Sequence, residues 1–162
     1  MTNLQKIEQK ILNDQTLLQA LETWRNLNYK IVFTNGCFDL LHKGHVDYLS
    51  KASDLGDVLV VGLNSDSSVK RLKGANRPIL DETSRAIILA SFSFITAVVP
   101  FSEDTPLNLI KKIQPDILVK GADYKPEDIV GYDIVMAKGG TISTLDYLPG
   151  CSTTEIINKI KG

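Results

Sequence analysis

The chain has 162 residues, 43% of them hydrophobic, which is the size and composition of one domain with a complete core. Its formal net charge of -1 and its pI of about 6.1 exclude a general electrostatic attraction to nucleic acid or to an anionic membrane. Two cysteines are too few for a disulfide scaffold, and the polar N-terminus carries no secretory signal, so we expect a cytoplasmic protein.

Residues 1–28 are predicted to form an N-terminal helical segment that packs on the edge of the main domain. Apolar residues three and four apart mark two helical faces, one within residues 4–11 and one within residues 17–24. Asn13 or Asp14 is a suitable cap for the start of the second helix.

From residue 30 onward, short apolar runs alternate with stretches of helical character. The runs are rich in β-branched residues and mostly uninterrupted by polar ones, which indicates strands covered on both faces. We therefore predict an α/β fold, a Rossmann-like, doubly wound, parallel five-stranded sheet with helices on both faces, in a single domain over residues 1–162. The expected strands are residues 31–33, 58–63, 95–99, 117–119 and 141–145, and the expected helices are residues 45–55, 82–91, 106–112, 126–137 and 153–161.

Polar segments, most of them with a glycine, follow four of the expected strands. In a doubly wound sheet, ligands bind beyond the carboxyl ends of the strands, near the point where the strand order reverses. We therefore expect these segments to converge on one edge of the sheet. They are residues 35–36, 64–66, 120–123 and 150–154.

Residues 36–45, which read GCFDLLHKGH, place two histidines three apart at a strand-to-helix turn. The free backbone N–H groups of a helix start attract anions, and Gly36 lets a phosphate approach the backbone. His42 and His45 add donors on one helical face that can carry charge near neutral pH. The segment thus favours a polyphosphate site. Two alternatives are ordinary helix capping and a zinc ion shared with Asp39 or Cys37.

This ten-residue segment resembles the signature of the small nucleotidyltransferases related to class I aminoacyl-tRNA synthetases, with His-x-Gly-His at its end. The resemblance implies that His42 and His45 contact the phosphates of the nucleotide and stabilise the transition state. It also implies that Mg²⁺ assists mainly through the ATP phosphates, with no protein ligand assigned to the metal. The further nucleotide-binding residues that we expect here are Asn35, Gly36, Cys37, Phe38 and Gly44.

Residues 64–74 and 77–79 have two interpretations, a solvated helix and loop, or a basic segment that closes over substrate phosphates. This stretch and residues 104–106 and 115–124 resemble the adenylyltransferase domain of bacterial ADP-heptose synthases. Lys120 either pairs with Asp123 or holds a sugar phosphate, and Arg85 either solvates its helix or contacts substrate. The expected substrate-binding residues are Asp39, Asn64, Asp66, Lys73, Arg85, Lys120, Gly121 and Asp123.

Residues 152–155, Ser-Thr-Thr-Glu, form a capping box ahead of an amphipathic helix. The same helix start, with three adjacent hydroxyls, suits β- and γ-phosphates. By resemblance Ser152, Thr153 and Thr154 are the second phosphate motif of the same nucleotidyltransferases. In residues 147–151 the chain departs from many relatives, since it lacks an acidic residue near Pro149 and an aromatic residue at position 151.

Taken together, the resemblances imply an adenylyltransferase that joins ATP to D-glycero-β-D-manno-heptose 1-phosphate, with release of pyrophosphate, for lipopolysaccharide core synthesis. A homodimer is also implied, and neither nucleic acid nor a membrane is an expected partner. Two other functions stay open at this point. One is a cytidylyltransferase that acts on glycerol 3-phosphate or a similar alcohol phosphate, and the other is a nucleotide-binding regulatory module without turnover.

Overall fold

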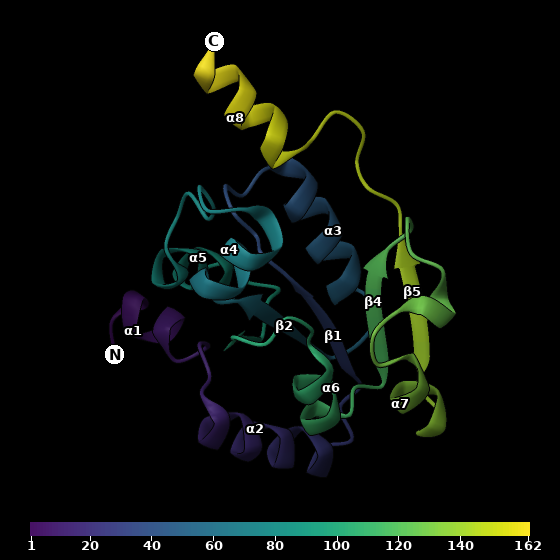
Figure 1. Cartoon of the computed structure of the whole chain (residues 1–162). Helices are drawn as coiled ribbons and strands as arrows, with labels where there is room; N and C mark the ends of the chain where they lie inside the picture. The colour runs from purple at the N-terminus through teal and green to yellow at the C-terminus, as the bar shows by residue number, and fades with distance from the viewer.

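The computed structural model describes residues 1–162 and contains one five-stranded sheet in the order β3-β2-β1-β4-β5, with every ladder parallel (Figure 1). The strand order reverses between β1 and β4, as the doubly wound prediction requires. The fold class predicted from the sequence is confirmed. The strands are β1 (Ile31–Gly36), β2 (Val58–Asn64), β3 (Ala97–Phe101), β4 (Ile117–Gly121) and β5 (Thr141–Leu145).

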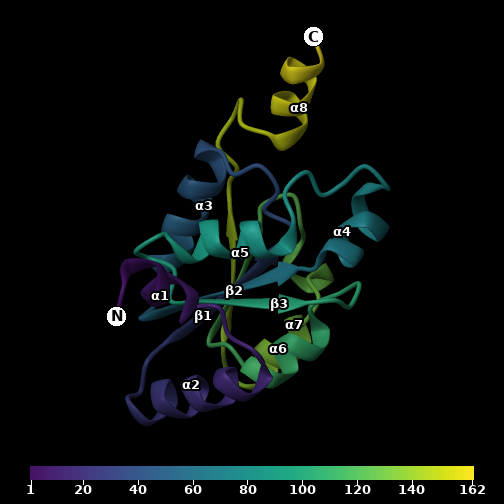
Figure 2. The same cartoon turned by 90° about the vertical axis from the view of Figure 1, so that its left-hand side faces the viewer.

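Helices cover both faces of the sheet (Figure 2). One hydrophobic core packs α2, α6 and α7 against the sheet, and the other packs α3 and α5, with α1 at its margin. The alternation along β1 explains the two cores, because Ile31 and Phe33 enter the first and Val32 enters the second. The helices are α1 (Asn3–Glu8), α2 (Asp14–Asn26), α3 (Lys43–Ser53), α4 (Asp66–Lys73), α5 (Glu82–Ala90), α6 (Leu107–Ile113), α7 (Tyr132–Ala137) and α8 (Thr153–Lys161), with a 3₁₀ turn at Pro126–Asp128. None of these helices has the length and apolar character needed to cross a membrane.

The N-terminal segment packs against the sheet, and its first helix is shorter than predicted. Asn13 caps α2 by accepting a hydrogen bond from the backbone N–H of Thr16, and Leu17 is fully buried in the core below. The expected helical face through residue 11 is wrong, because α1 ends at Glu8 and Ile11 forms a parallel bridge with Val98. The open edge of β3 offers unpaired backbone groups, and pairing with them replaces the last turn of the helix.

Several other boundaries differ from the predictions, among them the ends of β1, β4 and α3, and two of the differences have a local reason. β3 begins at Ala97 instead of residue 95, because the hydroxyl of Thr96 accepts the backbone N–H of Leu59 in place of a strand carbonyl. The helix expected over residues 126–137 is divided into a 3₁₀ turn and α7. Gly131 stands between them with φ +91°, a left-handed conformation that interrupts a right-handed helix.

Candidate functional site

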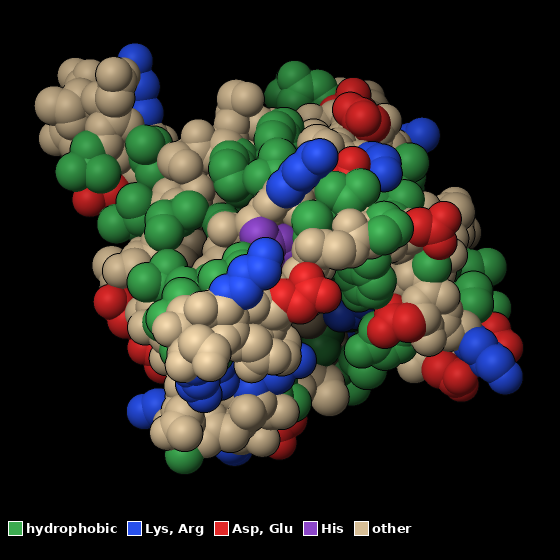
Figure 3. Space-filling view, turned by 90° about the horizontal axis from the view of Figure 1, so that it is seen from above, with side chains coloured by type: hydrophobic (Ala, Val, Ile, Leu, Met, Phe, Trp, Pro, Cys, Tyr) green, Lys and Arg blue, Asp and Glu red, His purple; other side chains and the backbone are tan.

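A cavity of about 820 Å³ opens beyond the carboxyl ends of the strands. Seen from above, the histidines lie in a hollow flanked by basic and hydrophobic side chains (Figure 3). The expected convergence is confirmed for residues of all four strand-end segments, although not for every residue in them. Those on the wall are Asn35, Gly36, Asn64, Lys120, Gly121, Cys151, Ser152, Thr153 and Thr154.

His42 and His45 each accept a backbone N–H at the start of α3 through their own Nδ1 atom. Nδ1 of His42 accepts the backbone N–H of Gly44 at 3.1 Å, and Nδ1 of His45 accepts the backbone N–H of His42 at 3.4 Å. The two rings stack with centroids 3.8 Å apart and an interplanar angle of 22°. Because each Nδ1 accepts a hydrogen bond, the neutral rings carry their proton on Nε2. The pair therefore supplies two Nε2–H donors whose orientation is fixed by the backbone.

The environment keeps both rings neutral. Burial, together with the nearby ring of His42, lowers the pKa of His45 to about 4. Burial also lowers the pKa of His42, against an opposing influence from Glu155. The expectation that these histidines carry charge near neutral pH is therefore wrong for the free protein, since a charged ring would lose solvation and repel its stacked neighbour. They act as neutral donors.

The turn that leads into this helix is strained on either side of Asp39. Phe38 and Leu40 have φ values of 47° and 51°, the left-handed region that side chains other than glycine rarely adopt. The carboxylate of Asp39, whose side chain is 0% exposed, accepts Arg77 Nε at 2.9 Å. It also accepts the backbone N–H groups of Ile79 at 2.7 Å and Leu80 at 3.0 Å. These bonds hold the strained turn against residues 77–80.

Asp39 was expected to bind substrate, and its geometry shows another use. Burial raises the pKa of this carboxyl group, but the hydrogen bonds from Leu80, Ile79 and Arg77 outweigh burial and leave it below its usual range. Asp39 lines the cavity, and in this structure three donors already engage its carboxylate, which holds the loop.

Arg85 and Asp66, two other expected substrate residues, do not reach the cavity. The Arg85 side chain is 0% exposed and pairs with Asp66 at 2.8 Å. Three other guanidinium donors bind the backbone carbonyls of Leu80, Cys37 and Asn64. Four of its five N–H donors are engaged in this way and the side chain lies buried outside the cavity wall, so Arg85 joins the ends of β1 and β2 instead.

The start of α8 contacts the turn between β1 and α3. Ser152 caps the helix by accepting the N–H of Glu155 at 3.0 Å, which is the half of the predicted capping box that forms. The Thr153 hydroxyl donates to the backbone carbonyl of Asp39 at 2.8 Å. Close packing beside it depends on Gly44, where an added Cβ would lie 2.9 Å from Cβ of Cys151. The two motifs, far apart in sequence, thus form adjacent parts of one wall.

The remaining expected residues divide between the wall and the surface. Lys73 and Lys120 line the cavity, and burial lowers the pKa of Lys120 to about 8. Gly121 lies under the ring of Tyr147, so close that an added Cβ would be 2.1 Å from its hydroxyl oxygen. Asp123 is exposed and outside the wall.

Sequence reasoning missed three tyrosines on the wall. Tyr48 lies one helical turn after His45 and bonds Thr34 through its hydroxyl at 2.9 Å, so its spacing on α3 was a usable signal. Tyr124 and Tyr147 lie in loops after β4 and β5, where sequence periodicity does not show which way a side chain points. The zinc alternative lacks a ligand set, because no group of three or more candidate metal-binding side chains occurs in residues 1–162.

Residues 33–159 match the cytidylyltransferase-like family. The chain belongs to this family. The matched range contains the histidine segment and the Ser-Thr-Thr segment, so the resemblance to nucleotidyltransferases inferred from those residues is confirmed at the level of the family.

Curated relatives of this family member include two proteins named bifunctional protein HldE. The one from Geobacter metallireducens is 56% identical over 93% of this chain, and the one from Syntrophotalea carbinolica is 55% identical over 94%. The chain spans 31% of the length of each. Among solved structures, a lipopolysaccharide core biosynthesis protein from Thermoplasma volcanium is 26% identical, with a TM-score of 0.59 over 74% of this chain and 97% of that one.

Proposed function

We propose that this chain transfers the adenylyl group of ATP to D-glycero-β-D-manno-heptose 1-phosphate, giving ADP-heptose and pyrophosphate. The observation that carries the proposal is that His42 and His45 share one cavity wall with Ser152, Thr153 and Thr154. Two helix starts and two fixed imidazole donors suit a triphosphate. This chain is similar to about a third of the length of proteins that are named bifunctional, which supports the assignment of one of their two activities to it. The resemblance of residues 115–124 favours the adenylyltransferase activity.

In the proposed reaction an oxygen of the sugar phosphate attacks the α-phosphorus of ATP. The new P–O bond forms as the bond to the β-phosphate oxygen breaks, and pyrophosphate leaves with the electron pair. The nucleophile is already anionic, so no general base is needed, which agrees with the low pKa of His45. The Nε2–H groups of His42 and His45 donate to phosphate oxygens as negative charge develops on them. Catalysis then rests on positioning and electrostatic stabilisation.

We propose that Mg²⁺ enters the site bound to the phosphates of ATP and is not held there by protein side chains. The buried carboxylate within the histidine motif, Asp39, already accepts three hydrogen bonds, and the structure has no cluster of candidate metal ligands. This wall suits an ion carried by the phosphates, where it would neutralise part of the triphosphate charge. A cytoplasmic location is proposed because ATP is the proposed substrate and both cysteines are free thiols. The homodimer stays a prediction.

Pyrophosphate release tests the proposal. The protein is assayed with ATP or CTP against heptose 1-phosphate, mannose 1-phosphate and glycerol 3-phosphate, in Mg²⁺. We expect the fastest release with ATP and heptose 1-phosphate. Faster release with CTP and glycerol 3-phosphate would replace the proposal with the cytidylyltransferase alternative. Tight ATP binding without release for any acceptor would favour a regulatory module.

A further inference from the structure

β1 and β4 separate at their carboxyl ends. Their shared ladder ends at the pair Phe33 and Leu118, whereas the ladders on their outer sides continue to the last residues of both strands. Asn35 and Lys120 each lie two residues beyond that last pair, so they stand on opposite sides of the gap. This gap is the point where the strand order reverses, and both side chains lie on the cavity wall.

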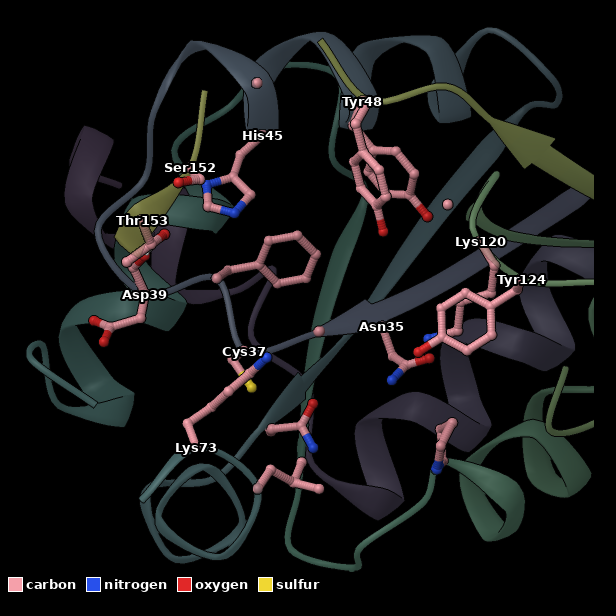
Figure 4. Close-up of a pocket in the computed structure, with 18 of the residues that line it drawn as sticks. Asn35, Cys37, Asp39, His45, Tyr48, Lys73, Lys120, Tyr124, Ser152 and Thr153 are labelled. Carbon is pink, nitrogen blue, oxygen red and sulfur yellow. Dashed lines mark hydrogen bonds between the residues drawn. The ribbon is translucent and has the colours of Figure 1, made fainter. Parts of the chain in front are cut away.

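Asn35 carries the one buried side-chain oxygen or nitrogen in residues 1–162 that has no hydrogen-bond partner. That atom is Oδ1, and the side chain projects from β1 into the cavity in Figure 4. A buried acceptor without a donor is costly and uncommon in folded proteins. The missing partner must be an O–H or N–H group that arrives with a ligand or with water.

On the opposite side of the gap, Lys120 presents a positive charge that no carboxylate neutralises. Its ammonium group forms no ion pair with a carboxylate, and it lies 5.7 Å from the centre of the Tyr124 ring. The other charged or titratable groups that face it are Asp123 and Cys37, both of which favour its charged form. A partly buried ammonium that pairs with no carboxylate favours an anionic ligand.

We propose that Asn35 and Lys120 form a subsite for a phosphorylated sugar, in which Asn35 Oδ1 accepts a hydrogen bond from a sugar hydroxyl and Lys120 pairs with the phosphate beside it. A sugar phosphate provides a donor and an anion in one small molecule, which is the combination that the two sides of the gap require. The inference rests on the proposed function, where both substrates contain such a group, the ribose of ATP and the acceptor sugar. Sequence analysis divided these two residues between nucleotide and acceptor. Their placement across one gap assigns them to the same sugar.

Asn35→Leu tests the subsite because leucine has nearly the same shape and no acceptor. The full chain is used, with Asn35→Ala as a second variant in case leucine does not fit. Asn26→Leu is the matched control, since Asn26 is exposed at the end of α2 and outside the cavity wall. Thermal melting without ligand checks the fold. We expect Asn35→Leu to melt no lower than Asn26→Leu, because it removes an unpartnered buried acceptor.

Calorimetric titration then separates the two sugars without turnover. ATP and its 2′- and 3′-deoxy analogues are titrated first, and heptose 1-phosphate is titrated into the complex with α,β-methylene-ATP. A loss of about tenfold in affinity for heptose 1-phosphate alone identifies the acceptor sugar. A similar loss for ATP, together with loss of discrimination against a deoxy analogue, identifies the ribose.

Two results would overturn the inference. One is affinity within twofold of wild type for both ligands in a folded Asn35 variant. The other is weaker ATP binding when the wild type never distinguished ATP from its deoxy analogues, since the contact is then not to a hydroxyl. Absence of pyrophosphate release by a wild type that binds both ligands would contradict only the proposed function, because these titrations do not depend on turnover.

Discussion

His42 has two separable roles that one pair of substitutions can distinguish. Its Nδ1 accepts the N–H of Gly44 and caps α3, while its Nε2–H is the proposed donor to phosphate. Asparagine is a favourable N-cap residue whose side-chain oxygen can accept the same N–H, but it is too short to replace the distal ring nitrogen. Alanine removes both groups. We therefore expect His42→Asn to lose the catalytic role alone and His42→Ala to lose both.

The magnitudes follow from these contacts. Loss of one preorganised donor costs roughly 10²–10³-fold in kcat, so both variants should fall by that factor. Loss of an N-cap costs about 1 kcal/mol, so only His42→Ala should be less stable than wild type by that amount. For a domain of this size, about 1 kcal/mol corresponds to roughly 2–4 °C in Tm.

Pyrophosphate release at saturating substrate measures the first effect, and thermal or urea unfolding of the free protein measures the second. The proposed donor role is refuted if folded His42→Asn keeps kcat within threefold of wild type. The proposed capping role is refuted if the two variants unfold at the same temperature. Because the two readouts are independent, either role can fail alone.

Three further predictions concern the supports of the site. Burial lowers the pKa of Lys120 to about 8, so the side chain loses its positive charge above that pH. The value of kcat/KM for the sugar phosphate should therefore fall about tenfold per pH unit above pH 8, and Lys120→Arg should remove that fall. Asp39→Ala should lower the free energy of unfolding in urea by about 3–5 kcal/mol, because it leaves buried donors without a partner. As a control, Asp47→Ala removes one partner of an exposed ion pair and should lower it by no more than about 1 kcal/mol. Gly121→Ala should displace the ring of Tyr147 toward solvent, since that ring is 58% exposed, and KM should rise by a factor of about five or more while stability changes by less than about 1 kcal/mol. An unchanged KM would contradict the closeness of the ring to the substrate.

The parts of the fold that follow local rules were predictable from the sequence. All five strands, the cap at Asn13 and the cap at Ser152 depend on residues within a few positions of one another. The convergence of the strand ends was also predictable, because it follows from parallel topology alone. Ile11 departed from its pattern because a sheet edge, formed by distant residues, competed for its backbone.

The use of individual charged side chains was not predictable in the same way. Arg85 and Asp39 have the composition of substrate-binding residues, and only the tertiary structure shows that their hydrogen-bonding groups are already occupied. The neutral state of His45 depends on burial and on the ring stacked against it, which no spacing reveals. Asn35 was assigned from its neighbours in the sequence, whereas the lack of a partner for its buried oxygen depends on the tertiary structure around it.

Asp39 explains why the three parts of the site come together. Its carboxylate holds residues 77–80, its carbonyl accepts the hydroxyl of Thr153, and its backbone lies between two residues in the left-handed conformation. The turn stays in this strained form because the bonds on either side of it are satisfied only in that conformation. The start of α8, a helix with no buried residue, reaches the cavity through the same turn. One aspartate therefore couples the histidine motif, residues 77–80 and the start of α8, so loosening it should disturb the whole wall at once.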